Sequence, residues 1–326
     1  MMSDVQTPRI TIGITCYNAE DSIERAIESA RAQTWPSVDI LIVDDASTDE
    51  SVTRIQRAIE GDARCALIVH DKNKGVAGAR NTLMNAAQGL FIAFFDDDDM
   101  SDPRRLEKQY LRLAMYEKEN GASQVVCFTG VRRHYPNGYA PVFQAIGSKE
   151  KIPKGHDLVA YHVYLDRDPA VFYGNGTPCL TFMARVETLR AVGGFDEKLR
   201  RNEDGEFCIR LGLCGGHAIG CPDILVEQAA SGGHDKRPEI SLESDLYIIE
   251  KYRDLLIKEG RYDEAKLWSR MKYAHHAGKK LSAALLLAKF IFKHPVRAIK
   301  RIFLRVPTRL LHEWKFSRLA RVAKTS

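Results

Sequence analysis

The most informative stretch of this chain is Phe91-Ile-Ala-Phe-Phe95, which is followed directly by Asp96-Asp97-Asp98-Asp99. Five apolar residues in a row predict a strand that is buried on both faces, as in the middle of a parallel sheet. Carboxylates crowded at its C-terminal end raise one another's pKa, and a divalent cation removes that cost. Mg²⁺ and Mn²⁺ prefer carboxylate oxygen, and Mg²⁺ completes its shell with substrate phosphates. The stretch therefore predicts a metal–diphosphate site at a strand end.

The acidic run also has a simpler interpretation, a solvated turn that caps the next helix. Asp102 suits the N-cap and Pro103 the first position of a helix that ends near residue 120. We assign the cap to Asp102. We assign the metal site to Asp96 and Asp98, which lie directly at the strand end.

Apolar strand-like runs alternate with amphipathic segments along the first hundred or so residues. Strands are expected at 10–15, 40–43, 66–69 and 91–95, with later ones at 124–128 and 181–185. Asn18 can cap the first helix. This alternation predicts an α/β fold with right-handed βαβ units and a mostly parallel sheet flanked by helices. Ligands bind beyond the carboxyl ends of such strands, so we expect the side chains just after them to converge: Tyr17, Asp45, Arg80 and Asp98.

The composition is that of an ordinary globular protein, with 326 residues, 44% of them hydrophobic and 28% charged. One large α/β domain with a smaller appendage is expected at this length. The first eight residues are polar and contain no secretion signal, so we expect a cytoplasmic location. Seven scattered cysteines without a Cys-x-x-Cys pair indicate reduced thiols and argue against a zinc site.

The net charge of +5 conceals a basic tail. Residues 279–326 contain 13 Lys or Arg and one acid, so this segment carries +12 and the rest of the chain −7. Its apolar run 281–292 is too short to span a bilayer. Interleaved apolar and basic residues, with Trp314 as an anchor, favour peripheral binding to an anionic membrane surface on the cytoplasmic side. The alternative is that the apolar face packs on the catalytic body. Nucleic acid is not expected as a partner, because the tail contains no recognisable nucleic-acid module.

A set of short motifs recurs in a fixed order between residues 9 and 245. Each is weak alone, and together they are specific: Thr15-Cys-Tyr-Asn18, Val43-Asp-Asp-Ala-Ser47, Asn73-x-Gly75, Ala79-Arg-Asn81, Asp96-x-Asp98-Asp99, Gly193-Gly-Phe-Asp196, Glu203-Asp204 and His234. In this arrangement the sequence resembles the family 2 glycosyltransferases with the GT-A fold. The resemblance implies a catalytic domain over residues 1–245 and leaves 246–326 as a helical extension, amphipathic and basic from about 279.

The resemblance implies inverting transfer of a sugar from a nucleotide donor, usually a UDP-sugar. It assigns Asp45 and Tyr17 to the nucleoside, and Arg80 to the base or the diphosphate. The chemistry agrees, because a carboxylate accepts an imide N–H, an aromatic ring stacks on a base, and a guanidinium suits phosphate. The alternative for Asp45 is a turn hydrogen bond with Ser47, and for Arg80 a surface ion pair. Thr15, Asn73, Gly75 and Glu203 belong to the same expected binding site.

The resemblance also implies a bound Mn²⁺ or Mg²⁺. Asp98 is the expected metal ligand, and Asp96 is expected to touch ribose or the donor sugar. Asp97 stands where a small or neutral residue is usual, which leaves open how Asp96, Asp97 and Asp99 share their roles. His234, after two glycines, resembles a late histidine that binds metal or diphosphate, and a neutral imidazole can complete a Mn²⁺ shell. The alternative is an exposed loop histidine.

Asp204 is the candidate general base. Inversion needs one in-line displacement in which a carboxylate accepts the proton of the acceptor hydroxyl. A helix N-terminus keeps such a carboxylate ionised, although Glu203 and Asp204 could also simply complement the helix dipole.

The expected function is therefore transfer to a hydroxyl of a glycan or glycolipid in cell-surface polysaccharide or lipopolysaccharide synthesis. The alternatives are a polyprenyl-phosphate sugar transferase and a catalytically silent nucleotide-sugar-binding protein. Residues 132–178, expected to be irregular, would help to set acceptor choice. A Rossmann dehydrogenase is excluded because no Gly-x-Gly-x-x-Gly follows the first strand.

Overall fold

The computed structural model describes residues 7–230, 237–299, 301 and 316. The chain divides into two compact units. The first comprises Met1–Arg133, Val142–Leu199 and Glu203–Ala229, and the second His134–Pro141, Arg200–Asn202 and Ala230–Ser326. The predicted domain boundary at residue 245 remains a prediction.

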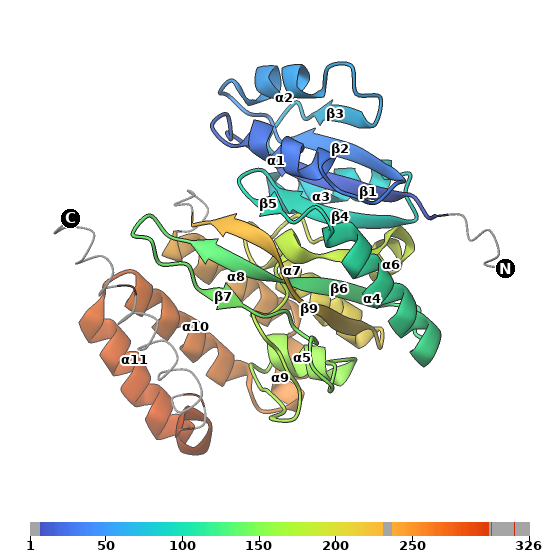
Figure 1. Ribbon diagram of the computed structural model, residues 1–326. Coiled ribbons are helices and arrows are strands. Elements are labelled where there is room, and N and C mark those ends of the chain that lie inside the picture. The colour runs from blue at the N-terminus through green and yellow to red at the C-terminus, as the bar shows by residue number, and fades with distance from the viewer. Residues whose placement is uncertain (1–6, 231–236, 300, 302–315, 317–326) are drawn as a thin grey trace. The chain divides into compact units, whose positions relative to one another are not determined.

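Parallel strands form the half of the sheet that contains the acidic run (Figure 1). In spatial order they are β3 (Cys65–Val69), β2 (Val38–Asp44), β1 (Ile10–Cys16) and β4 (Phe91–Asp96). Thr15 in β1 lies opposite Val43 of β2 on one side and Asp96 of β4 on the other. The carboxyl ends of these three strands therefore lie at one edge of the sheet, as predicted.

Antiparallel pairing occurs among the remaining strands. They are β5 (Met100–Ser101), β6 (Val125–His134), β7 (Val142–Phe143), β8 (Met183–Arg185) and β9 (His217–Ala229). The described strands run in the order β3-β2-β1-β4-β8-β6-β9-β5, with β7 paired to β6. The α/β prediction is confirmed for a mixed sheet, in which β1 to β4 pair in parallel and β8 pairs antiparallel with β4 and β6.

Helices cover both faces of this sheet. Alternate side chains of each strand point to opposite faces and belong to two separate hydrophobic cores. One core joins the sheet to helices α1 (Ile23–Arg31), α2 (Ser51–Ile59) and α4 (Arg105–Asn120). The other joins it to α3 (Gly75–Ala86), α5 (His156–His162), α6 (Val186–Val192) and α7 (Glu203–Leu213). The strand 91–95 is buried on both faces, as its composition predicts.

Three local predictions are wrong. Ser22, not Asn18, occupies the N-cap of α1, and Asn18 has a left-handed φ of 49°. Helix α4 has Arg104 at its N-cap, so Asp102 and Pro103 lie before the helix, although Asp102 Oδ1 accepts a hydrogen bond from the Arg104 amide at 2.8 Å. Residues 132–178 are not irregular throughout, because they contain β7 and α5.

The second unit is helical. Its described helices are α8 (Pro238–Lys251), α9 (Arg253–Lys258), α10 (Tyr262–His276) and α11 (Lys280–Lys293). Helix α10 packs against both α8 and α11. None of the helices among the described residues is both long and apolar enough to cross a bilayer. Trp314 and residues 302–313, on which the tail prediction partly rests, lie outside the described residues.

Candidate functional site

Backbone hydrogen bonds join the loops that follow β1, β2 and β4. The Tyr17 amide donates to Asp97 Oδ2 at 3.0 Å, and the Asp45 amide donates to the Cys16 carbonyl at 2.8 Å. Tyr17 keeps 49% of its surface exposed, so its ring is available for stacking. The structure thus brings Tyr17, Asp45 and Asp97 to the same edge of the sheet, and it gives Asp97 a structural contact that the sequence did not suggest.

The Asp45 carboxylate is held in a fixed orientation. Its Oδ1 accepts hydrogen bonds from the Lys74 amide at 2.8 Å and from His70 Nδ1 at 2.7 Å, and its Oδ2 accepts from the Gly75 amide at 2.7 Å. A carboxylate offers about four acceptor positions, so Oδ2 retains one. Asp45 can therefore accept one further N–H, which is what recognition of a nucleobase imide requires.

Asn73 and Gly75 build the turn that supplies these amides. The Asn73 side-chain amide donates to the Asp45 carbonyl at 3.2 Å, and Asn73 Oδ1 accepts from the Gly75 amide at 3.2 Å. Gly75 has a φ of 79°, a left-handed conformation that favours glycine. The two predicted binding residues thus shape the loop around Asp45.

The turn hydrogen bond considered for Asp45 belongs to its neighbour. Asp44 accepts from the Ser47 amide at 2.9 Å and from the Ser47 hydroxyl at 2.5 Å. Since Asp44 is fully buried and carries the turn, the alternative interpretation of Asp45 as a partner of Ser47 is wrong.

His70 is a buried residue of this site that the sequence analysis missed. One ring nitrogen faces Asp45 and the other, Nε2, lies 2.9 Å from Thr82 Oγ1. The side chain thereby connects the Asp45 carboxylate to helix α3. Only its position directly after a strand could have indicated this role.

Arg80 joins two acidic segments that are far apart in sequence. Its guanidinium is buried, and it donates to Glu203 Oε1 at 2.5 Å and to Asp96 Oδ1 at 3.3 Å. The N-terminus of α7 therefore lies next to the end of β4. The surface ion pair considered for Arg80 is wrong, because these carboxylates and Arg80 are largely removed from water.

Glu203 and Asp204 form the first turn of α7. Glu203 forms the ion pair with Arg80, whereas Asp204 Oδ1 accepts a hydrogen bond from the Gly205 amide at 2.6 Å. An amide donor at a helix N-terminus stabilises the ionised carboxylate. Glu203 thus forms an ion pair with Arg80, and Asp204 accepts a hydrogen bond from a backbone amide of its own helix.

His162 packs against this turn of α7. A Cβ atom placed on Gly205 would lie 3.1 Å from His162 Nδ1, and His162 Nε2 lies 3.3 Å from Thr177 Oγ1. Burial lowers the pKa of His162 to about 4, so the imidazole is neutral near pH 7. His162 and Thr177 were not singled out from the sequence, because both lie in the segment 132–178 that was expected to be irregular.

The acidic run at the end of β4 is electrostatically unfavourable without a cation. Desolvation and the charges of Asp96 and Asp98, opposed by the Tyr17 amide, raise the pKa of Asp97 to about 7. Burial and the same two carboxylates raise the pKa of Asp99 to about 9, and Asp99 Oδ2 has no hydrogen-bond partner among the residues that the structure describes. Nearby positive charge would relieve this repulsion.

The donor set at this run fits a hard divalent cation that takes few protein ligands. Asp98, which is half-buried like Asp96 and Asp97, offers carboxylate oxygen, the ligand type that Mg²⁺ and Mn²⁺ accept. Among residues 7–230, 237–299, 301 and 316, no group of three or more His, Cys, Asp or Glu is arranged as a metal cage. His234 lies outside the described residues.

Asn81 connects α3 to the Gly193-Gly194 motif. Its side-chain amide donates to the Phe195 carbonyl at 2.9 Å, and its Oδ1 accepts from the Phe195 amide at 2.8 Å. A Cβ at Gly194 would come within 2.6 Å of Asn81 Oδ1, so this close approach requires glycine. The motif thus places the chain that leads into α7.

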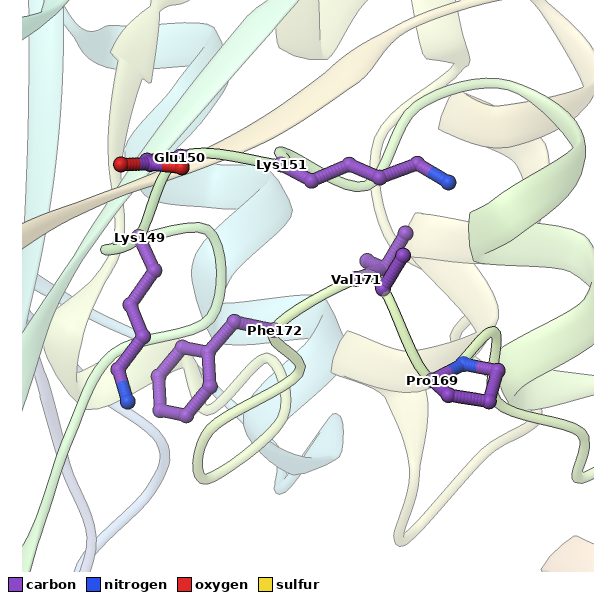
Figure 2. A pocket seen from close by; sticks show the side chains of 7 residues that line it. Lys149, Glu150, Lys151, Pro169, Val171 and Phe172 are labelled. Atoms are coloured by element: carbon purple, nitrogen blue, oxygen red, sulfur yellow. The ribbon is translucent and has the colours of Figure 1, made fainter.

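A separate hollow of about 610 Å³ lies in the predicted acceptor segment (Figure 2). It is lined by Lys149, Glu150, Lys151, Pro169, Ala170, Val171 and Phe172. Lys149 Nζ lies 4.3 Å from the centre of the Phe172 ring, and Lys151 pairs with Asp168 at 2.5 Å. None of the donor-site residues predicted from the sequence lines it.

The comparisons with known proteins agree with this geometry. Residues 11–171 match the model of glycosyl transferase family 2. The succinoglycan biosynthesis protein ExoO of Rhizobium meliloti is 41% identical over 107 residues, 33% of this chain and 30% of that protein. The Escherichia coli UDP-Glc:alpha-D-GlcNAc-diphosphoundecaprenol beta-1,3-glucosyltransferase WfgD is 39% identical over 111 residues, 34% of this chain and 42% of that protein. The matched stretch thus spans less than half of either relative.

Solved structures share the fold over most of the chain. TarS of S. aureus, in complex with UDP-GlcNAc, superposes with a TM-score of 0.58 at 19% identity, covering 89% of this chain and 82% of that one. The mannosyltransferase PcManGT of Pyrobaculum calidifontis, in complex with GDP-Man and Mn²⁺, gives 0.53 at 18% identity, covering 91% and 84%. The GT-A architecture and the motif order agree with the family match, and residues 11–171, just under half of the chain, belong to glycosyl transferase family 2.

Proposed function

We propose that this chain is a metal-dependent, inverting glycosyltransferase that moves a sugar from a nucleoside diphosphate donor, a UDP-sugar, to a hydroxyl of a glycan or glycolipid acceptor. The observation that carries this proposal is the buried Arg80, which holds Asp96 at the end of β4 next to Glu203 at the start of α7. Asp98, the expected metal ligand, lies two positions after Asp96. Asp204, the expected base, directly follows Glu203.

The donor side of the proposal rests on Asp45 and Tyr17. The remaining acceptor position of Asp45 Oδ2 suits the imide N–H of uracil, and the exposed Tyr17 ring suits its face. TarS in complex with UDP-GlcNAc supports a UDP donor. Asp98 would hold Mn²⁺ or Mg²⁺, and such a cation neutralises charge that develops on a leaving diphosphate. The metal complex of PcManGT supports this assignment.

The transfer itself is a single displacement. The acceptor oxygen forms a bond to the anomeric carbon while the bond from that carbon to the diphosphate breaks, and UDP leaves. Asp204 accepts the proton of the acceptor hydroxyl. Arg80 takes no part in the proton transfer but keeps Glu203, and with it the first turn of α7, beside the end of β4.

The acceptor belongs to surface polysaccharide synthesis. ExoO acts in succinoglycan biosynthesis and WfgD, by its name, on a diphosphoundecaprenol-linked sugar. The hollow lined by Lys149 and Phe172 lies in the segment expected to set acceptor choice, away from the donor residues. It is the candidate acceptor-side surface.

A panel of nucleotide sugars tests the donor assignment. UDP-glucose, UDP-N-acetylglucosamine and GDP-mannose are each added with and without MnCl₂, and the melting temperature and the release of nucleoside diphosphate are measured. We expect a UDP-sugar to raise the melting temperature only with Mn²⁺ and to be slowly hydrolysed, since a ligand stabilises the state that binds it. No rise with any nucleotide sugar would contradict the proposal. Binding without any hydrolysis or transfer would instead support the silent binding protein.

A further inference from the structure

Helix α11 presents an apolar face that no described residue covers. Leu281, Leu285 and Phe292 are 76%, 64% and 88% exposed, and Val296, in the helical residues 295–299 that follow α11, is 79% exposed. Positions 281, 285 and 292 recur at the spacing of one helix face. Large apolar side chains grouped in this way mark an interaction surface. We call these four side chains the outer face.

The opposite side of α11 is fixed within the second unit, and this explains why the outer face is exposed. Phe290 is fully buried, with its ring centre 5.3 Å from that of Trp268 in α10. Glu264, which is 1% exposed, pairs with Arg297 at 2.8 Å and with Arg301 at 2.6 Å. Rotating α11 to bury the outer face would remove Phe290 from the core and break these ion pairs.

The charged residues of α11 itself are all basic. Lys289 and Lys293 lie on the flank of α11 next to the apolar stripe, and both are exposed. The sequence contains no Asp or Glu between residues 265 and 312. Two copies of this chain that met through their outer faces would bring these lysines together, and like charges repel. An anionic surface with an apolar interior satisfies both the lysines and the apolar side chains.

We propose that the outer face of α11 docks the protein on an anionic lipid bilayer, with Phe292, Leu285, Leu281 and Val296 inserted among the acyl chains and Lys289 and Lys293 at the headgroups. The apolar side chains supply the insertion and the lysines supply the preference for anionic lipid. This surface belongs to the described residues, so it does not depend on the segment from 302 to 315.

Flotation of the full chain with vesicles tests the proposal. One set of vesicles is phosphatidylcholine alone, and the other is phosphatidylcholine with phosphatidylglycerol. We expect the wild-type protein to float with the anionic vesicles and much less with the neutral ones, and high salt to weaken the binding. The double variant Leu285→Ser/Phe292→Ser should bind the anionic vesicles about tenfold or more weakly than the wild type. Lys289→Glu/Lys293→Glu should lose the preference for anionic vesicles.

The matched control is Leu111→Ser/Met115→Ser on α4, whose side chains are 56% and 55% exposed and lie four positions apart in the first unit. We expect this variant to float like the wild type. Because all substituted positions are exposed, unchanged melting temperatures are expected and are measured alongside. The readout needs neither donor nor acceptor, so it is independent of the test of glycosyl transfer.

Two results would overturn the proposal. One is equal flotation of the wild type and Leu285→Ser/Phe292→Ser. The other is a wild-type dimer in light scattering that the same substitutions convert to a monomer, without vesicle binding by either protein. The second result would make the outer face a contact between copies of this chain.

Discussion

The two acidic strand ends of the sheet are built in opposite ways. At the end of β2, the Asp45 carboxylate receives two backbone amides and His70, and one acceptor position remains. At the end of β4, carboxylates crowd together, and the pKa values of Asp97 and Asp99 rise because of burial and neighbouring charge. A carboxylate that is already satisfied can recognise one more N–H without a cation. Crowded carboxylates that are not satisfied call for positive charge. The contrast supports our proposal that the first end recognises the nucleobase and the second holds the cation.

Removal of the proposed base gives the largest expected effect. Asp204→Asn should lower kcat about 10²–10⁴-fold, because the acceptor hydroxyl then has no carboxylate to accept its proton. The measurement is steady-state transfer with the donor found in the nucleotide-sugar panel. This variant tests whether Asp204, at the start of α7, takes part in the same reaction as the acidic run at the end of β4.

Glu187→Gln is the matched control, because Glu187 is also an acid in the first turn of a helix and is exposed. It should leave kcat unchanged. If Asp204→Asn kept nearly full turnover while its melting temperature stayed at the wild-type value, Asp204 would only complement the helix dipole. An acceptor that is already an anion, such as a polyprenyl phosphate, would then be favoured.

Loss of Arg80 should destabilise the folded protein next. Arg80→Met leaves Asp96 and Glu203 largely buried without their cation, and breaking a buried pair in this way costs about 3–5 kcal/mol. Urea unfolding measures the difference. Arg132→Met, which removes an exposed partner of Glu227, should cost about 1 kcal/mol or less. Equal losses for the two variants would show that the Arg80 bridge is no more than a surface pair.

The smallest expected effect concerns the satisfied strand end. His70→Leu removes one hydrogen bond to the Asp45 carboxylate, and hydrogen bonds to charged groups contribute about 1.5–3 kcal/mol. We expect KM for the donor to rise about tenfold or more with little change in kcat. The proposed contact between Asp45 and the nucleobase is the same in the bound donor and in the transition state, so weakening it affects both equally. Thr82→Val removes a hydroxyl that contacts His70 and the Gly78 carbonyl, and it should raise KM less. A drop in kcat at unchanged KM would contradict the positioning role.

The sequence predicted the parallel half of the sheet well because local signals there are strong. Each strand of that half is a short apolar run, and the residues that follow β1, β2 and β4 do meet at one edge. In the other half, the strands expected at 124–128 and 181–185 overlap β6 and β8, whereas β9 was not predicted. Strands β6 and β9 run 10 and 13 residues with partners far away in sequence, and no local pattern specifies such pairing.

Within the site, residue types could be predicted but not their contacts. Arg80 was expected at the nucleotide, yet its partners are Asp96 and Glu203, the latter 123 positions away. His70 was missed because a single histidine after a strand has no distinctive spacing. Asp44 rather than Asp45 makes the turn with Ser47, a distinction that depends on backbone geometry and not on composition.

The central claim is that Asp45, after β2, and the acidic run at the end of β4 bind the same nucleotide together with its cation. Calorimetric titration of UDP into the wild type, Asp45→Asn and Asp98→Asn, each with and without Mn²⁺, tests it most directly, with Asp102→Asn as a control in the same acidic segment. We predict that Asp98→Asn abolishes the increase in UDP affinity that Mn²⁺ produces, that Asp45→Asn weakens UDP binding in both conditions, and that Asp102→Asn behaves as the wild type. Wild-type affinity and Mn²⁺ dependence in both Asp45→Asn and Asp98→Asn would contradict the claim.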